Sequence, residues 1–421
     1  MNREQKENIS NIFENGFVIL SFLFFSNAFI PLLQGAEEGS VVLKGSDPVS
    51  FVLQNGIYLV TSFLLFRMKS QAFRFASKER LIWLLLAIAL ISPMWSELPF
   101  VTLRKGMVVC ATTLFGLYLG ARYSIGEQLR LLSWTMWLVV ICSLFFVVLL
   151  PHYGITTELH SGAWRGIYSQ KNVLARMMVL GSLVFLIIKL HGFGKWVFPE
   201  IGILVCIAIL VMTRSMSAVV ILAALVVLIP FYRLCRLHPY LLLVFILMLV
   251  AGAGILEFFP TLNFESLLEG MDRDTTLTGR TELWELVLLK ISQRPWLGYG
   301  FGSFWHEQST ESKFVISLAG WNAQHSHNGY LDLLLSLGVL GLTVFVVSLL
   351  NALRKCFSFL RNSIGIEGVW FATYLLFMVN YNITESTIIK ENSIFWVLYV
   401  SVLFSVADKY SQLTKSANGH A

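Results

Sequence analysis

Charged side chains are scarce in this 421-residue chain. Lys, Arg, Asp and Glu make up 13% of the residues, whereas hydrophobic residues make up 56%. So few charges cannot cover the surface of a water-soluble protein of this size. Apolar runs long enough to cross a hydrocarbon layer of about 30 Å, which takes roughly 20 helical residues, recur from end to end. The sequence therefore predicts an all-α integral membrane protein and excludes a soluble fold.

Metal-binding spacing is also lacking. The 5 cysteines lie in or beside apolar runs without a CxxC pair, so we interpret them as small packing residues. The run Asp272-Arg273-Asp274 resembles the DxD of metal-dependent nucleotide-sugar transferases, but a charged run in a solvated loop is the simpler interpretation. No metal or cofactor site is predicted.

The apolar runs predict about twelve transmembrane helices. They lie near residues 17–33, 50–66, 81–95, 106–121, 132–150, 173–190, 196–212, 216–232, 239–258, 329–350, 369–381 and 393–407. No small-residue cleavage site follows the first, which we therefore expect to be a retained helix. With both termini in the cytoplasm, every inner segment carries at least two Lys or Arg residues, as an inner-membrane protein requires. The net charge of +6 is thus a topology signal and does not indicate a nucleic-acid partner.

These spans divide the chain into three parts. Residues 1–258 hold nine predicted spans, 259–328 form a long periplasmic loop, and 329–421 hold three spans and a cytoplasmic tail. The loop is too aromatic for disorder. Within it, apolar residues recur at helical spacing, at Leu283, Trp284, Val287, Leu288 and Ile291, while Glu282, Glu285 and Lys290 can take the opposite side, so we expect a short interfacial helix.

A glycine-rich turn follows that helix. Pro295 ends the helix, and Gly298, Gly300 and Gly302 come next. The strand-to-helix context of a dinucleotide-binding loop is missing, so a turn is the better interpretation of this GxGxG.

Cations at the outer boundary need an explanation other than topology. Polar groups at membrane depth are costly unless they are paired or line a wet cavity. Three patches, at residues 164–172, 277–284 and 325–332, combine cations, aromatics and histidines, and a cluster of guanidinium groups suits a diphosphate. The cations of interest are Arg104, Arg165, Lys171, Arg214 and Arg280.

His327 lies where the last patch opens a span. The helix dipole disfavours an imidazolium at a helix N-terminus and favours the neutral ring, which can act as a base. Asn328 or Ser326 could cap the same turn. From these residues alone, a structural hydrogen-bonding role for His327 and a role as base both stay open.

The order of these patches resembles the O-antigen ligase and Wzy-type polysaccharide polymerase superfamily, especially its exopolysaccharide-production branch. The resemblance covers roughly residues 90 to 400. It rests on Arg165-Gly166 with Lys171-Asn172, on Thr278 to Trp284, on Arg294 to Gly302, and on His325, His327, Asn328, Leu331, Gly338 and Gly341. Trp95-Ser96, Pro99 and Arg104 also fit. Gln170 stands where many relatives have histidine, so no catalytic role is expected at that position.

The resemblance implies a metal-independent glycosyltransferase with a GT-C-like membrane architecture. Its donor would be an undecaprenyl-diphosphate-linked oligosaccharide on the periplasmic side. The acceptor hydroxyl would belong to another repeat unit in a polymerase or to lipid A-core in a ligase, and the 325–332 patch favours the polymerase. Membrane lipids surround such a protein, and a chain-length regulator is a further partner to consider.

The reaction needs a base for the acceptor hydroxyl and stabilisation of the departing diphosphate. We expect His327 to be the base, with His325 as alternate or orienting partner. Arg280 and Arg165 would bind the diphosphate, supported by Lys171, Arg214 and Arg104. Glu385 would hold an acceptor sugar or an arginine, and Asn328 and Trp284 would serve the acceptor or the structure.

Two other classes remain alternatives. A transporter or lipid-linked oligosaccharide flippase could also have twelve spans, but such folds usually show two similar halves, and the long loop has no counterpart in the first half. A non-catalytic scaffold would leave the concentration of Arg and His without a physical purpose.

Overall fold

The computed structural model describes residues 3–29, 48–157, 162–192, 197–232, 276–362 and 365–418. Within these ranges the regular structure is helical, apart from an isolated bridge between Ile155 and Trp164. The prediction of an all-α protein is therefore confirmed for the described part of the chain. Two compact units share the chain: residues 1–63, 123–226 and 392–394 form the first, and 64–122, 227–391 and 395–421 form the second.

Six helices in the described ranges are long and apolar enough to cross a membrane. They are α3 (Pro48–Arg67), α6 (Pro99–Arg122), α7 (Ile125–Leu149), α9 (Lys171–Leu190), α15 (Gly329–Asn362) and α17 (Ile394–Asn418). Shorter apolar helices lie in α1 (Arg3–Phe25), α5 (Arg80–Ile91) with η1 (Ser92–Met94), α10 (Pro199–Met212) and α11 (Met216–Phe231). α16 (Ile366–Thr384) is almost wholly buried. A membrane protein is thus confirmed, but the number twelve stays a prediction, and the span near 239–258 lies outside the described residues.

In the first unit, α9 packs against α10 and α7, and α7 packs against α1. A Cβ atom on Gly181 of α9 would lie 2.9 Å from the Sγ atom of Cys206 on α10. Cys206 is fully buried at this contact. It therefore acts as the small packing residue that the sequence predicted.

In the second unit, α6 and α17 approach closely through small residues. A Cβ atom on Gly116 would lie 2.8 Å from both the carbonyl oxygen of Val397 and the Cβ atom of Val400. One turn on, a Cβ atom on Gly120 would lie 3.1 Å from the carbonyl oxygen of Ser401. Glycines four residues apart are a common way for membrane helices to bring their backbones together.

We expect Gly116→Ala to destabilise the protein by about 1–3 kcal/mol, because the added methyl group overpacks this contact. The measurement is the thermal unfolding midpoint of purified protein in detergent. Gly56→Ala is the matched control, since Gly56 lies within α3 and a Cβ atom there meets nothing within 4 Å. Equal midpoints for the two variants would contradict the close packing of α6 on α17.

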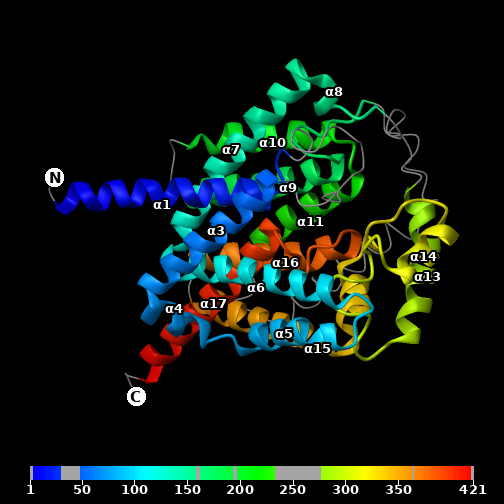
Figure 1. Ribbon diagram of the computed structural model, residues 1–421. Helices are drawn as coiled ribbons and strands as arrows, with labels where there is room; N and C mark the ends of the chain where they lie inside the picture. The colour runs from blue at the N-terminus through cyan, green and yellow to red at the C-terminus, as the bar shows by residue number, and fades with distance from the viewer. Residues whose placement is uncertain are drawn as a thin grey trace. The chain divides into compact units, whose positions relative to one another are not determined.

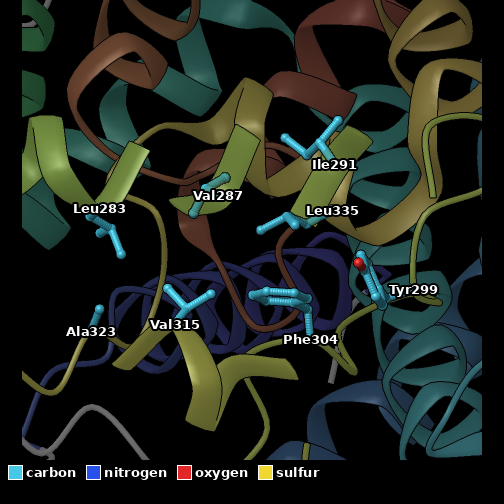
Figure 2. Packing of buried hydrophobic residues seen from close by; sticks show 8 residues of the cluster. All are labelled: Leu283, Val287, Ile291, Tyr299, Phe304, Val315, Ala323 and Leu335. Atoms are coloured by element: carbon cyan, nitrogen blue, oxygen red, sulfur yellow. The ribbon is translucent and has the colours of Figure 1, made fainter. Parts of the chain in front are cut away.

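α13 (Thr276–Gln293) and α14 (Thr310–Ala319) pack side by side in the second unit (Figure 1). Figure 2 shows their shared core, in which Leu283, Val287 and Ile291 of α13 belong to one cluster with Val315 of α14. The predicted helix and its buried stripe are confirmed at these positions. Leu288, however, is 52% exposed.

Lys290 is also placed differently from the prediction. It is buried, pairs with Glu311 at 2.6 Å, and its ammonium lies 4.3 Å from the centroid of the Phe314 ring. Periodicity finds the apolar stripe of α13 but not the side from which α14 approaches. That helix supplies a carboxylate that allows Lys290 to be buried.

The glycine turn docks on α15. Gly298, Gly300 and Gly302 have φ values of 65°, 97° and 67°, as a tight turn requires. Gly338 breaks the helical backbone of α15 with φ 63°, and a Cβ atom there would lie 2.3 Å from the carbonyl of Trp296. The interpretation of the GxGxG as a turn is thus confirmed.

Candidate functional site

The loop of residues 325–328, which we call the His loop, directly precedes α15. The Oδ1 atom of Asn328 accepts the N–H groups of Tyr330 at 3.0 Å and Leu331 at 3.2 Å. Ser326 donates its hydroxyl to the Asn328 carbonyl at 2.7 Å. Asn328 therefore makes the predicted cap and Ser326 braces it, so that the backbone of the loop is fixed.

Three predicted site residues meet around this loop. His327 has φ 53°, an uncommon value outside glycine, and its N–H donates to Nδ1 of His325 at 3.1 Å. The two imidazole centroids are 4.0 Å apart. Glu385, buried directly after α16, offers a carboxylate oxygen that lies within 4.8 Å of a ring nitrogen of each histidine. Its carbonyl oxygen accepts the N–H of Gly329 at 2.9 Å.

The pKa of His327 lies below the ordinary value of 6.5, chiefly because the ring is buried. The carboxylates of Glu385 and Asp332 act in the opposite direction, while the cations Arg280 and Lys390 lower the pKa further. His327 is therefore neutral at neutral pH and can accept a proton. The helix dipole led the sequence argument to the same state, but burial is the larger cause.

Three buried nitrogen atoms of this region lack a hydrogen-bond partner in the described part of the chain. They are Nε of Arg280, Nε1 of Trp321 and Nδ1 of His327. The rings of Trp321 and His327 are 5.8 Å apart, and the Arg280 charge acts on His327. A buried donor without a partner is costly. These nitrogens therefore have hydrogen-bonding capacity for an oxygen-rich ligand.

Tryptophan and aspartate side chains hold the His loop in place. Trp284, on α13, donates its indole N–H to the Ser326 carbonyl at 2.7 Å. Asp332, on the first turns of α15, accepts the N–H of Ser326 at 3.0 Å and the indole N–H of Trp305 at 2.8 Å. Asp332 was not among the site residues predicted from the sequence. The sequence does contain a signal for it, a carboxylate near the start of an apolar span, because a charged group at membrane depth is energetically costly unless it is paired.

Arg165, Lys171 and Arg214 belong to the first unit. Arg165 is 2% exposed, and its Nε and Nη2 atoms donate to the carbonyl oxygens of Tyr153 at 3.0 Å and His152 at 2.9 Å. The Arg165 side chain is thus bonded to the carbonyl groups of α8 (Pro151–Gly154). Lys171 is buried at the start of α9, and Nη2 of Arg214 lies 3.6 Å from the Cβ position of Gly162. Diphosphate binding by these three residues stays a prediction.

Arg104 is exposed on α6 of the second unit. Burial, Lys105 and Arg104 lower the pKa of His306, which Glu307 partly opposes. Lys105 donates to the Gly302 carbonyl at 3.0 Å and pairs with Glu391 at 3.5 Å. The charge of Arg104 therefore acts on His306, and the part of Arg104 in diphosphate binding stays a prediction.

The residues that could hold a metal ion are His325, His327 and Glu385, since each offers one ligand atom. Arg280 and Lys390 act on the same site, and their positive charge opposes the binding of a dication. Glu385 and Asp332 act on the site with the opposite sign, so the absence of a metal ion from the reaction stays a prediction. The DxD-like run at 272–274 lies outside the described residues.

Comparison with known proteins agrees with the resemblance inferred from the motifs. Residues 201–346 match the sequence model of the O-antigen ligase family. The exopolysaccharide production protein ExoQ of Rhizobium meliloti (strain 1021) is 28% identical over 92 residues, 20% of each chain. The putative polysaccharide ligase RC0486 of Rickettsia conorii is 29% identical over 136 residues, 31% of this chain and 32% of that protein. The putative polysaccharide ligase of Rickettsia felis is 30% identical over 140 residues, again 31% and 32%.

The matched segments span between about a fifth and a third of these relatives. The family match includes α13, α14 and the His loop, whereas Glu385 lies beyond it. The likeness to O-antigen ligases is therefore confirmed over the part of the chain that carries His327 and Arg280, and the chain also resembles an exopolysaccharide-production protein.

Proposed function

Because residues 201–346 match the O-antigen ligase family, we propose that this protein is an inner-membrane glycosyltransferase. It transfers an undecaprenyl-diphosphate-linked glycan to a sugar hydroxyl and so polymerises exopolysaccharide or O-antigen repeat units. The observation that carries the proposal is the imidazole of His327, whose buried Nδ1 atom has no hydrogen-bond partner among the described residues and which lies beside the carboxylate of Glu385. The charge of Arg280 acts on the same ring. A base and an anion site are thus close together, as glycan transfer from a lipid diphosphate requires.

In the proposed reaction, an imidazole nitrogen of His327 takes the proton of the acceptor hydroxyl. The acceptor oxygen forms a bond to the anomeric carbon of the donor, and the bond from that carbon to the diphosphate oxygen breaks. The electron pair leaves with the lipid diphosphate, whose charge Arg280 stabilises. The carboxylate of Glu385 stabilises the imidazolium that forms. The diphosphate is a good leaving group, so the reaction needs neither an acid nor a metal ion.

The proposed topology follows the positive charges of the inner segments. About twelve spans, both termini in the cytoplasm and a site on the periplasmic face allow the polyprenyl tail to remain in the bilayer. Residues 259–328 would cover the site in a GT-C-like arrangement. Cysteine labelling of the loop in intact spheroplasts tests this orientation.

A ligase is the second candidate. The Rickettsia relatives are named putative polysaccharide ligases, and the family is that of the O-antigen ligases. The acceptor would then be lipid A-core in place of a second repeat unit. The resemblance to the exopolysaccharide branch favours the polymerase.

The test is an assay of purified protein with undecaprenyl-diphosphate repeat unit in the presence of a chelator, first alone and then with lipid A-core. We expect a ladder of products in the first reaction. A single transfer that requires core would establish the ligase, and loss of activity on chelation would refute the metal-free mechanism. Absence of product in both reactions, from folded protein, would favour the flippase.

A further inference from the structure

The carboxylate of Asp332 is shared by three donors. Its Oδ1 atom accepts the indole N–H of Trp305 at 2.8 Å and the N–H of Ser326 at 3.0 Å. Its Oδ2 atom accepts the hydroxyl of Ser386. All three are bonds that a carboxylate accepts.

These donors come from the segments that meet at the site. Trp305 follows the glycine turn, Ser326 precedes His327, and Ser386 follows Glu385. Asp332 thus ties the chain on one side of His327 to the chain beyond α16. The segment beyond α16 is also held by Asn382, whose Oδ1 atom accepts the N–H of Thr387 at 2.8 Å. The relative position of His327 and Glu385 therefore depends on the side chain of Asp332, which lies outside both the His loop and the segment after α16.

We propose that Asp332 is a positioning residue for His327: its carboxylate fixes the His loop against Glu385 and places a negative charge beside the imidazole. This rests on the proposed function, in which His327 accepts a proton. The charge favours the imidazolium that forms during transfer, and the bonds keep Glu385 within reach of it. Asp332 touches no substrate in this role.

The charge of Asp332 acts on His327 together with four other groups. Arg280 of α13 and Lys390 of the chain before α17 lower the pKa of His327, while Glu385 raises it. His325 is in ring contact and accepts a hydrogen bond from the His327 backbone. Removing the negative charge of Asp332 leaves the two cations less opposed, so the pKa of His327 falls.

Two substitutions separate the charge from the bonds. In Asp332→Asn the amide oxygen can still accept from Trp305 and Ser326, and the Ser386 hydroxyl can rotate to accept from the amide nitrogen, so that only the charge is lost. In Ser386→Ala one bond is lost and the charge stays. Glu311→Gln is the matched control, because it removes a carboxylate that pairs with Lys290 in the same unit.

We expect Asp332→Asn to lower kcat about tenfold, to change the donor KM less than about twofold, and to shift the acid limb of the pH–rate profile to lower pH. Ser386→Ala is expected to lower kcat without moving that limb, and Glu311→Gln to do neither. An Asp332→Asn enzyme with the kcat and pH profile of the wild type would overturn the proposal. An acid limb that moves equally in Glu311→Gln would also overturn the proposal.

A second readout does not need turnover. In protein labelled with ¹³C-histidine, the ring signal missing from His327→Gln reports the titration of His327. We expect its midpoint to fall in Asp332→Asn and to stay in Glu311→Gln. An unmoved midpoint refutes the role of Asp332 even where wild-type protein transfers glycan. If wild-type protein transfers none, the proposed function fails, whereas the shift of the midpoint still decides whether Asp332 acts on His327.

Discussion

Replacing His327 with alanine is expected to lower the rate of glycan transfer by about two to four orders of magnitude, the usual range for the loss of a general base. Affinity for the lipid-linked donor is expected to stay close to that of the wild type, because the diphosphate contacts are assigned to arginine. The measurements are single-turnover transfer and donor binding on the same purified protein.

His306→Ala is the matched control for this substitution. His306 lies in the same unit, and burial also lowers its pKa. Its Nδ1 atom accepts the N–H of Gln308 at 3.2 Å, and its own N–H donates to the carbonyl of Ser303 at 3.1 Å. The control is expected to transfer glycan at the wild-type rate. A folded His327→Ala variant with wild-type output would remove the base assignment and leave His327 with a structural role.

The pH dependence of transfer has a definite sign. The acid limb reports the protonation of His327, whose pKa lies below 6.5 because the ring is buried. Activity should therefore persist at pH values where an exposed histidine would already be charged, and fall only below them. An acid limb centred above 6.5 would mean that another group titrates, since burial, Arg280 and Lys390 all act against a charged His327.

Replacing Arg280 with alanine is expected to weaken donor binding by about 10- to 100-fold, the usual cost of losing hydrogen bonds to a charged group. Arg280 is 8% exposed, and its Nε atom has no partner among the described residues, so this donor is available to a ligand. Arg280→Lys should recover only part of the affinity, because an ammonium cannot bind a phosphate through two parallel donors. Binding is measured with the undecaprenyl-diphosphate repeat unit in nanodiscs.

Arg294→Ala is the matched control in the same part of the chain. Arg294 is exposed, and its guanidinium carbon lies 4.9 Å from the centroid of the Tyr299 ring. Unchanged affinity in Arg280→Ala, or an equal loss in Arg294→Ala, would remove the assignment of Arg280 to the diphosphate. The same test on Arg165 must include a stability measurement, since that side chain bonds the carbonyls of His152 and Tyr153.

Much of this architecture could be predicted because membrane-spanning helices appear in a sequence as long apolar runs. Eleven of the twelve predicted spans overlap helices in the described residues, and the apolar stripe of α13 was visible in its spacing. Residue spacing shows that α13 has an apolar stripe but not how much of the helix surface α14 covers. It therefore did not show that Leu288 is exposed and Lys290 is buried. A buried lysine also needs a carboxylate from elsewhere, and Glu311 is 21 residues away.

The site was predictable in part for a related reason. His327, Asn328 and Arg280 lie in motifs that carry the family resemblance, so their sequence context marks them. The approach of Glu385 to His327 depends on the tertiary structure, because the chain after α16 lies against the His loop. Asp332 was missed because its importance lies in three bonds to side chains and backbone that are distant in sequence.

The packing of α6 on α17 also constrains how the protein is made. The indole N–H of Trp396 donates to the hydroxyl of Thr113 at 2.9 Å, although 283 residues separate them. α6 therefore leaves the ribosome and enters the lipid long before its partner exists. During that interval the glycine face of α6 must rest against lipid or an insertion chaperone, and chains truncated before α17 should be targets for membrane proteases.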